Sequence, residues 1–547
     1  MNLRQGEHLA ITLINTLGVP NGNLPTPPPL QIERTSSDRA MQMPTDAKRD
    51  PYALMCNQPQ LAPTPTPDPQ TGRIYGYHRS PWNEANLHFH GLNTSPNQPS
   101  DDVVDVLLCP VAQQPVPGIY HYLVNIPRNE PPGAYWYHPH AHGESLYQVF
   151  QGLTGALIVH SLKPSVPDKL PNHIAIVRDA PAHQGIARPW KATAMRRAPT
   201  IKEIRPQLAA ASAAFKRNPG GDPFQPPDQC PGTPIPFNTT NLSINRLALP
   251  INGDQLRGLP RSKIGLGETQ YWSVVNTDAQ TSLDLVLLVN GKPAPLMVTA
   301  RDGVPLVVKN GHPTYQAVPM SHVFLTPAGR IEFYLSGTTA GANMVIRTRA
   351  IDTGCVGDTD NARNLFYVKV GTTPVPPQAP IPPSVDTVPQ RFSDLAVQKP
   401  TRKRTFIFTE YLRADEPEPD FYITEISNPK AVEHPYRMSG PPDTVVKDGT
   451  VEEWTIVNYT NEIHAFHIHQ IHFMPIAGVT TEEGLGQLVD TVLVPHGGYD
   501  ASGKFRPRGV KLLMDFRARD IIGTFVYHCH FLEHEDGGMM ARIQVVP

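Results

Sequence analysis

Histidine is the residue type in this chain whose spacing points to chemistry. Of the 22 histidines, twelve lie in four short windows, at residues 88–90, 138–142, 464–472 and 528–534. Histidines that serve only in core packing would be scattered along the sequence rather than grouped. Because imidazole is the commonest metal-binding side chain, the grouping predicts a metal protein.

Each window contains a pair of histidines separated by one residue. The four pairs are His88 and His90, His138 and His140, His467 and His469, and His528 and His530. On a β-strand, residues i and i+2 point to the same face, so each pair can present two imidazoles to one site. One such pair is weak evidence, but four in a single chain indicate a shared metal centre.

The last window indicates which metal is bound. Cys529 stands between two histidines, His534 follows it by five residues and Met539 by ten, and His464 precedes the third pair. One thiolate, two imidazoles and a weak thioether form the ligand set of a blue-copper electron-transfer site. Structural zinc usually takes several cysteines, and the other cysteines here are remote. Copper is therefore favoured, with Met539 preferred over Met540 by its spacing.

The alternation of side chains along a strand divides the ligands between two sites. Cys529 faces one metal, while its neighbours His528 and His530 face the opposite side. Eight paired histidines remain for the second site. At two to three imidazoles per ion, eight ligands fit three metals better than two, and one peptide unit joins the thiolate to this cluster.

The four motifs resemble those of the multicopper oxidases, the laccase and bilirubin-oxidase class, and most closely the three-domain bacterial laccases of the spore-coat type. His-Phe-His-Gly, Trp-Tyr-His-Pro-His, His-x-x-His-x-His and His-Cys-His-x-x-x-His-x-x-x-x-Met stand in the family's order. The resemblance implies an all-β fold of three cupredoxin-like Greek-key β-sandwich domains with few short helices. It also implies four copper ions, one-electron oxidation of a donor, and four-electron reduction of O₂ to water.

The resemblance further implies a role for each ligand. The type 1 copper would be held by His464, Cys529 and His534, with Met539 as the axial ligand. The type 2 copper would be held by His88 and His467. One type 3 copper would take His90, His138 and His528, and the other would take His140, His469 and His530.

Reduction of O₂ to water consumes protons, so a carboxyl group near the cluster is expected as a relay. Glu535, directly after His534, is the first candidate, because it matches an acidic position of the bacterial members. Asp101 and Asp102 are the candidates for a second acid, and the sequence does not decide between them. His142 and His472 are not needed as ligands, and we expect them to contact the ligands from outside or to face solvent.

A threefold repeat indicates the elements that position these residues. Gly6 to Thr16, Gly267 to Thr277 and Gly449 to Thr460 each place an asparagine nine residues after a glycine, with a strand-like run between them. Three copies at one internal spacing predict one domain type used three times. The abundance of proline, 62 of 547 residues, also favours strands and turns over long helices. The best helix candidate is residues 206–217.

Proline-rich stretches suggest where the domains join. We expect cupredoxin-like domains at residues 1–162, 172–370 and 400–547, with a proline-rich linker at 371–399. The first and third domains carry the copper ligands, and the second is expected to be structural. Cys56, Cys109, Cys230 and Cys355 could form two disulfides, with Cys56–Cys109 and Cys230–Cys355 as the preferred pairs, although the sequence does not fix the pairing.

The net charge bears on the binding partners of the protein, and the first residues bear on its cellular location. Charged residues make up 18% and the formal net charge is −2, so no basic field favours nucleic acid or an anionic membrane. We expect a monomer whose partners are O₂ and small donors. Residues 1–7 lack a basic segment followed by an apolar one. The protein is therefore either secreted or periplasmic with its leader absent here, or it is cytoplasmic or spore-coat associated.

The sequence says little about which electron donor the protein uses. Phenols and aromatic amines are preferred over metal ions such as Cu(I), Fe(II) or Mn(II). The 13 methionines form no methionine-rich segment, which argues against Cu(I) as the donor. The run Asp415-Glu416-Pro417-Glu418-Pro419-Asp420 could serve as a cation port, although a solvated acidic loop is its ordinary interpretation. Copper storage is a non-enzymatic alternative, but storage would not need the alternating His-Cys-His segment.

Overall fold

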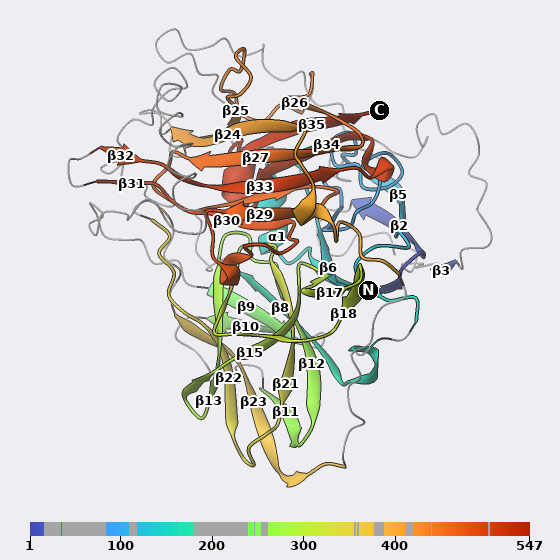
Figure 1. The fold of residues 1–547 in the computed structure, drawn as a ribbon, viewed down its shortest axis with the longest axis vertical. Helices are drawn as coiled ribbons and strands as arrows, with labels where there is room; N and C mark the ends of the chain where they lie inside the picture. The colour runs from blue at the N-terminus through green and yellow to red at the C-terminus, as the bar shows by residue number, and fades with distance from the viewer. Residues whose placement is uncertain are drawn as a thin grey trace, which may run out of the picture.

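The regular secondary structure of this computed structural model is almost entirely β-strand, arranged as three pairs of sheets (Figure 1). The structure describes residues 1–15, 34–35, 84–108, 118–163, 165, 167–179, 239–244, 247–252, 261–354, 357, 360, 362–376, 388–411, 419–438, 440–500 and 504–547. In Figure 1 the C-terminal strands lie above the middle ones, and β6 and α1 lie where the two groups meet. The all-β, cupredoxin-like fold expected from the sequence is confirmed.

The N-terminal sheet pair carries the first two histidine pairs. Its four-stranded sheet has the order β1 (Asn2–Arg4), β7 (Gly155–His160), β6 (Gly133–His138), β4 (His88–His90). Its three-stranded sheet has the order β3 (Arg34–Thr35), β2 (His8–Asn15), β5 (Gly118–Asn125). In β5, buried and exposed residues alternate, as expected for a strand with one face on the core.

The middle sheet pair is the larger. Its eight-stranded sheet contains β10 (Leu247–Asn252), β9 (Thr239–Ile244), β8 (Asn172–Asp179), β12 (Thr269–Asn276), β21 (Arg330–Ser336), β15 (Leu296–Arg301), β16 (Val304–Pro305) and β19 (Val318–Met320). Its six-stranded sheet contains β11 (Arg261–Leu266), β23 (Arg363–Pro374), β22 (Asn343–Thr348), β13 (Leu283–Val289), β14 (Lys292–Ala294) and β20 (Val323–Leu325). A hairpin of β17 (Val307–Lys309) and β18 (His312–Thr314) stands beside them.

The C-terminal sheet pair carries the other two histidine windows. One sheet has the order β25 (Asp420–Glu425), β24 (Arg402–Tyr411), β27 (Thr450–Asn458), β33 (Arg508–Phe516), β29 (Phe473–Ala477). The other has the order β26 (Thr444–Lys447), β35 (Met540–Val546), β34 (Gly523–Cys529), β28 (His464–Ile468), β30 (Thr491–Val494). A short pair, β31 (Gly498–Tyr499) and β32 (Phe505–Arg506), completes this part.

Helices are few and short in the described ranges. The α-helices are α1 (Ser145–Phe150) and α4 (Leu532–Asp536), and the 3₁₀ helices are η2 (Pro167–Lys169), η4 (Leu395–Val397), η5 (Thr481–Glu483) and η6 (Arg519–Ile521). Among the described residues, no helix has both the length and the apolar character needed to cross a membrane.

The sequence repeat corresponds to one structural device in each sheet pair. Gly6, Gly267 and Gly449 all adopt positive φ, between 78° and 87°, and each is followed by a long strand: β2, β12 or β27. The asparagine that ends the strand is buried, and its Nδ2 donates to a nearby carbonyl: Asn15 to Leu108, Asn276 to Thr281 and Asn458 to Glu462. The repeat is therefore a glycine turn, a strand and an asparagine-stapled turn, used three times.

Small apolar clusters join the three sheet pairs. One cluster packs Trp136 and Ile158 of the first pair against Val275 of the middle pair. A second packs α1 against Leu532 of α4. A third packs Val103 and Val104 against Val526 and Met540, so the first and last parts of the chain meet directly.

Some expectations fall outside the described residues. These are Cys56, Cys109, Cys230 and Cys355, the helix at 206–217, and residues 415–418 of the acidic run. In the expected linker, β23 continues past residue 370 to Pro374, and Phe392 and Leu395 are buried against Val451 and Leu513. The domain boundaries themselves stay predictions.

Candidate metal centre

Cys529, His464 and His534 converge in the C-terminal sheet pair, as the sequence predicts. Cys529 ends β34, His464 begins the neighbouring β28, and α4 brings His534 back toward the thiol. The Sγ atom of Cys529 lies 3.6 Å from the Nδ1 atoms of both histidines, and these two Nδ1 atoms are 2.9 Å apart. The three donor atoms thus surround a single point.

Outer contacts fix which ring nitrogen faces that point. Nε2 of His464 is hydrogen-bonded to Oγ1 of Thr460 at 2.7 Å, and Nε2 of His534 lies 3.2 Å from Oε1 of Glu462. Burial lowers the pKa of His464 well below its usual range and raises the pKa of the Cys529 thiol. The buried thiol can become a thiolate only when a cation is bound there, so the set fits a metal.

Met539 is tied to this group through its backbone. Its carbonyl accepts a hydrogen bond from the Cys529 amide at 3.0 Å, and its amide donates to the His534 carbonyl at 2.8 Å. Its side chain is fully buried in the apolar cluster that contains Cys529, whereas Met540 packs against Val103 and Val526. The packing therefore agrees with Met539 as the axial candidate.

The eight paired histidines meet on the other side of β34. Antiparallel pairing places His88 opposite His138 in the first sheet and His467 opposite His528 in the last. Their rings form a continuous group that joins the two sheet pairs: His88 stacks on His469 with ring centroids 3.6 Å apart, and His90 stacks on His467 at 4.0 Å. All eight residues are buried.

One subset corrects the grouping expected from the sequence. The Nε2 atoms of His140, His469 and His528 lie 3.1 to 3.3 Å from one another. The ring of His530 lies 4.9 Å from that of His90 and 5.3 Å from that of His138. His528 and His530 therefore exchange the places that we expected, because the i, i+2 rule sets their common face but not which neighbour each meets.

The hydrogen bonds of these histidines fit a set of metal ligands. For several of them one ring nitrogen is held by the protein: His88 Nδ1 by Asp101, His90 Nε2 by Asp490, His138 Nδ1 by the Pro139 carbonyl and His467 Nδ1 by the Asp490 carbonyl. Within the described residues, the other nitrogen of each has no hydrogen-bond partner although it is buried. Burial, together with the charge of His528, lowers the pKa of His88 to about 3, so its ring is a neutral lone-pair donor.

Two of the predicted carboxyl groups touch this histidine group. Glu535 is fully buried in α4, with Oε2 3.1 Å from Nδ1 of His528 and Oε1 3.6 Å from Nδ1 of His140. Asp101 contacts Nδ1 of His88 and also accepts a hydrogen bond from Gln470 Nε2 at 2.8 Å. Asp102 instead accepts hydrogen bonds from the amides of Val104 and Asp105, which is a local turn.

The outer histidines differ from each other. His142 packs edge-on against Tyr436, with ring centroids 4.9 Å apart. His472 is fully buried, donates from Nε2 to the Asp302 carbonyl at 2.9 Å and lies 3.6 Å from Asp490. His472 therefore makes the outer contact that its motif predicts.

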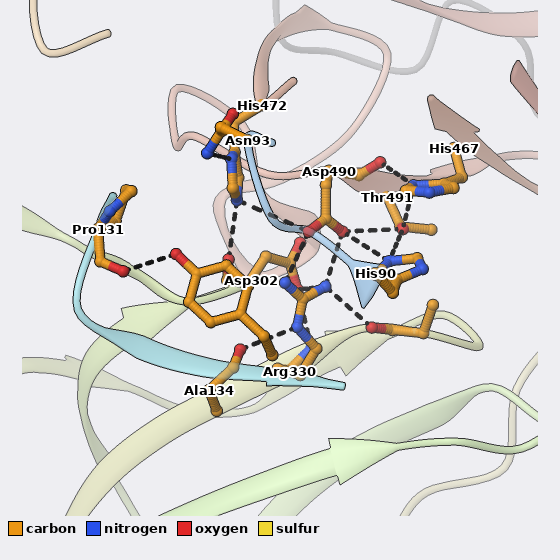
Figure 2. Close-up of polar contacts among 12 residues, drawn as sticks. His90, Asn93, Pro131, Ala134, Asp302, Arg330, His467, His472, Asp490 and Thr491 are labelled. Carbon is orange, nitrogen blue, oxygen red and sulfur yellow. Dashed lines mark hydrogen bonds and ion pairs between the residues drawn. The ribbon is translucent and has the colours of Figure 1, made fainter. Parts of the chain in front are cut away.

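Sequence reasoning missed the charged group behind the site. Figure 2 shows Arg330 of the middle sheet pair paired with Asp490, which in turn contacts His90. It also missed Glu462, which contacts His534, and Glu410, whose carboxyl group is hydrogen-bonded to Glu462. These are isolated charged residues in otherwise ordinary strands and turns, and no local spacing distinguishes them.

Comparison with known proteins matches both ends of the chain to one family. Two family models described as multicopper oxidase match residues 80–164 and 413–547. A laccase from Bacillus stratosphericus is 29% identical over 108 residues, which are 18% of this chain and 21% of that protein. The multicopper oxidase LPR1 homolog 5 from Oryza sativa subsp. japonica is 24% identical over 315 residues, 48% of this chain and 49% of its own length. The chain thus spans less than half of the length of these relatives.

Solved structures share the fold. A multicopper oxidase from Campylobacter jejuni, described as a metallo-oxidase, has a TM-score of 0.55 at 20% identity, with 84% of this chain and 80% of that chain covered. The McoA multicopper oxidase from Aquifex aeolicus has a TM-score of 0.55 at 17% identity, with 85% of each chain covered.

Proposed function

We propose that this chain, a member of the multicopper oxidase family, binds copper and is a laccase-like oxidoreductase. In this proposal it oxidises phenols or aromatic amines one electron at a time and reduces O₂ to water. Four bound copper ions supply the electron transfer and the O₂ reduction, and the chain supplies the ligands, the donor surface and the proton carriers.

The ligands are assigned to the ions from the contacts of their ring nitrogens. The type 1 ion would be held by His464, Cys529, His534 and axial Met539. The type 2 ion would be held by His88 and His467, whose free nitrogens are Nε2. The two type 3 ions would be held by one set of His90, His138 and His530 and another of His140, His469 and His528.

The alternation along β34 is the observation that carries the proposal. Sγ of Cys529 faces His464 and His534, and Nε2 of the adjacent His528 faces His140 and His469. Two separate donor groups are thus connected by one peptide unit. A copper store does not need this connection, whereas an enzyme that separates donor oxidation from O₂ reduction does.

His534 is the better candidate for the edge that meets the donor. Its exposed fraction is 6%, whereas His464 is fully buried. Phe421 stacks on the His534 ring with centroids 4.3 Å apart, and Phe531 lies at 5.3 Å. Phe421 is 1% exposed and Phe531 is 8% exposed, so an aromatic donor that reaches His534 would pack against the edge of Phe531. This supports phenols and aromatic amines as the donor class.

A second candidate function has one observation in its favour. Glu462 lies 3.2 Å from Nε2 of His534, and Glu410 is hydrogen-bonded to Glu462. Carboxylate oxygens beside the donor edge could hold Fe(II) or Mn(II), which would make the protein a metallo-oxidase; Cu(I) belongs to the same alternative. We keep it second because the two aromatic rings cover the same histidine.

We also propose that Glu535 and Asp101 relay protons that O₂ reduction consumes. Each carboxyl group touches a site histidine, Glu535 at His528 and Asp101 at His88. Asp102 has no such contact among its described hydrogen bonds, so it is the weaker of the two sequence candidates.

The decisive experiment compares donors on copper-loaded protein. We expect blue absorption and O₂ uptake with a series of phenols, with lower kcat/KM for Fe(II), Mn(II) and Cu(I). Cys529→Ser should abolish both the blue colour and the O₂ uptake. A blue protein that consumes no O₂ with any donor would contradict the oxidase function, and preferential Fe(II), Mn(II) or Cu(I) oxidation would favour the metallo-oxidase.

A further inference from the structure

A buried ion pair links the middle sheet pair to the histidine group. Arg330 begins β21, Asp490 immediately precedes β30, and both residues are fully buried. Nη1 and Nη2 of Arg330 donate to Oδ1 and Oδ2 of Asp490 at 2.7 and 2.6 Å, across 160 residues of sequence. Such a two-pronged geometry fixes the plane of the carboxylate.

The arginine is itself held from three directions. Its Nε donates to the Ala134 carbonyl of β6, its Nη1 donates to the Ala328 carbonyl, and its amide donates to Oδ1 of Asp302. The N-terminal, middle and C-terminal sheet pairs therefore meet at one guanidinium group (Figure 2).

Asp490 in turn accepts hydrogen bonds from two of the proposed copper ligands. His90 donates from Nε2 to Oδ1 of Asp490 at 3.1 Å, and His467 donates from Nδ1 to the Asp490 carbonyl at 2.7 Å. Oγ1 of Thr491 donates to the same Oδ1 at 3.0 Å and lies 3.3 to 3.4 Å from both rings. The opposite nitrogens, Nδ1 of His90 and Nε2 of His467, are buried without a hydrogen-bond partner in the described residues.

A glycine beside His90 makes room for the pair. Gly91 has φ +86°, and a Cβ atom there would lie 2.4 Å from Nη2 of Arg330 and 2.5 Å from Oδ2 of Asp490. The last residue of the His-Phe-His-Gly motif thus lets the ion pair lie directly against the backbone that carries His90. The pair and the motif fit each other closely.

We propose that Arg330 and Asp490 are positioning residues for copper, which orient His90 and His467 by holding the ring nitrogens that face away from the metal. The middle sheet pair supplies no predicted ligand, but through Arg330 it would set the copper affinity of the type 2 and type 3 sites. Outer partners of this kind typically change metal affinity by about 10- to 100-fold. The inference rests on the copper assignments proposed above.

The experiment measures copper in Arg330→Gln and Asp490→Asn proteins, by copper per chain and by electron paramagnetic resonance. We expect the apparent dissociation constant of the type 2 site to rise about 10- to 100-fold, with its hyperfine signal shifted. The type 1 signal and blue colour should stay unchanged. The control is Arg404→Gln, which breaks another buried arginine pair, with Glu425 and Glu452 in the C-terminal sheets.

The outcomes separate the inference from the proposed function. Wild-type protein without type 2 and type 3 copper would contradict the function itself. Variants with wild-type copper content and spectra, destabilised no more than Arg404→Gln, would show that the ion pair is only structural. If Arg330→Gln does not fold, Arg330→Lys retains the charge but loses the two-pronged contact, so a type 2 spectrum identical to wild type would likewise overturn the inference.

Discussion

Oε2 of Glu535 lies 3.1 Å from Nδ1 of His528, on the side of that ring opposite the nitrogen that faces His140 and His469. The carboxylate is fully buried, and α4 carries both it and His534. One short helix thus carries a ligand candidate for one metal site and a candidate proton carrier for the other.

Glu535→Gln should therefore slow turnover without disturbing the type 1 site. General acid–base groups typically contribute about 100-fold or more, so we expect kcat to fall by about that factor while the blue absorption is retained. The control is Glu533→Gln in the same helix, because Glu533 bonds Gln280 instead of a site histidine. Steady-state O₂ uptake measured over a range of pH tests this effect. A nearly unchanged turnover with the wild-type pH profile would contradict a relay role for Glu535.

Asp101 and Asp102 form a natural matched pair. Asp101→Asn weakens the contact with Nδ1 of His88, so we expect a loss of type 2 copper affinity of about tenfold or more. Asp102→Asn can still accept the amide hydrogen bonds of Val104 and Asp105, so copper binding should stay at the wild-type level. Copper titration of both variants measures the difference. If both variants lose copper affinity equally, the contact between Asp101 and His88 is not the reason for the loss.

Gly91→Ala tests how tightly the backbone approaches the Arg330–Asp490 pair. Gly267 has almost the same φ, +87°, but no described atom lies within 4 Å of its added Cβ. Gly267→Ala should cost about 1–2 kcal/mol of unfolding free energy from backbone strain alone. Gly91→Ala should cost clearly more, since its Cβ collides with both charged groups. Urea unfolding of the two variants gives the comparison, and similar losses would argue against a close fit.

Glu130 predicts a pH dependence of stability. Burial raises its pKa from 4.5 to about 7, although the Arg391 charge and the Asn93 hydrogen bonds oppose the shift. Between these values the folded chain keeps a proton that the unfolded chain releases. The free energy of unfolding therefore decreases as pH rises through that window and levels off above it.

Glu130→Gln removes this titration and can still accept the hydrogen bond from Asn93. We expect the variant to match the wild type near about pH 4.5 and to be more stable by up to about 3 kcal/mol near pH 8. Urea unfolding at both pH values measures the difference. A stability difference that does not change with pH would contradict the raised pKa.

The sequence carries much of the site because strand geometry is regular. The i, i+2 rule correctly places the histidine pairs on common faces and Cys529 on the opposite face of β34, and the glycine-to-asparagine spacing finds β2, β12 and β27. The same rule could not distinguish the neighbours of His528 from those of His530, because that depends on which strands meet across the sheet pairs.

The charged residues behind the site could not be predicted for a different reason. Arg330 and Asp490 are 160 residues apart, and each is a single charge with no periodic partner. These two residues matter because they are buried against each other, and this contact forms only when the sheets assemble. A segment without predicted ligands, such as the middle sheet pair, can thus hold a residue that the ligands depend on.

The distance along the chain between the two halves of the histidine group has a consequence for biosynthesis. His140 and His528 touch across 388 residues, and the thiol of Cys529 comes at the end of β34. A nascent or truncated chain that stops before this strand contains His464 and six of the eight paired histidines but lacks Cys529, so it cannot form the blue site. The blue site lies wholly within the C-terminal sheet pair, so its colour would report only that this part of the chain has folded. The type 3 sets take histidines from both ends of the chain, so type 3 copper would report that the two distant halves have met.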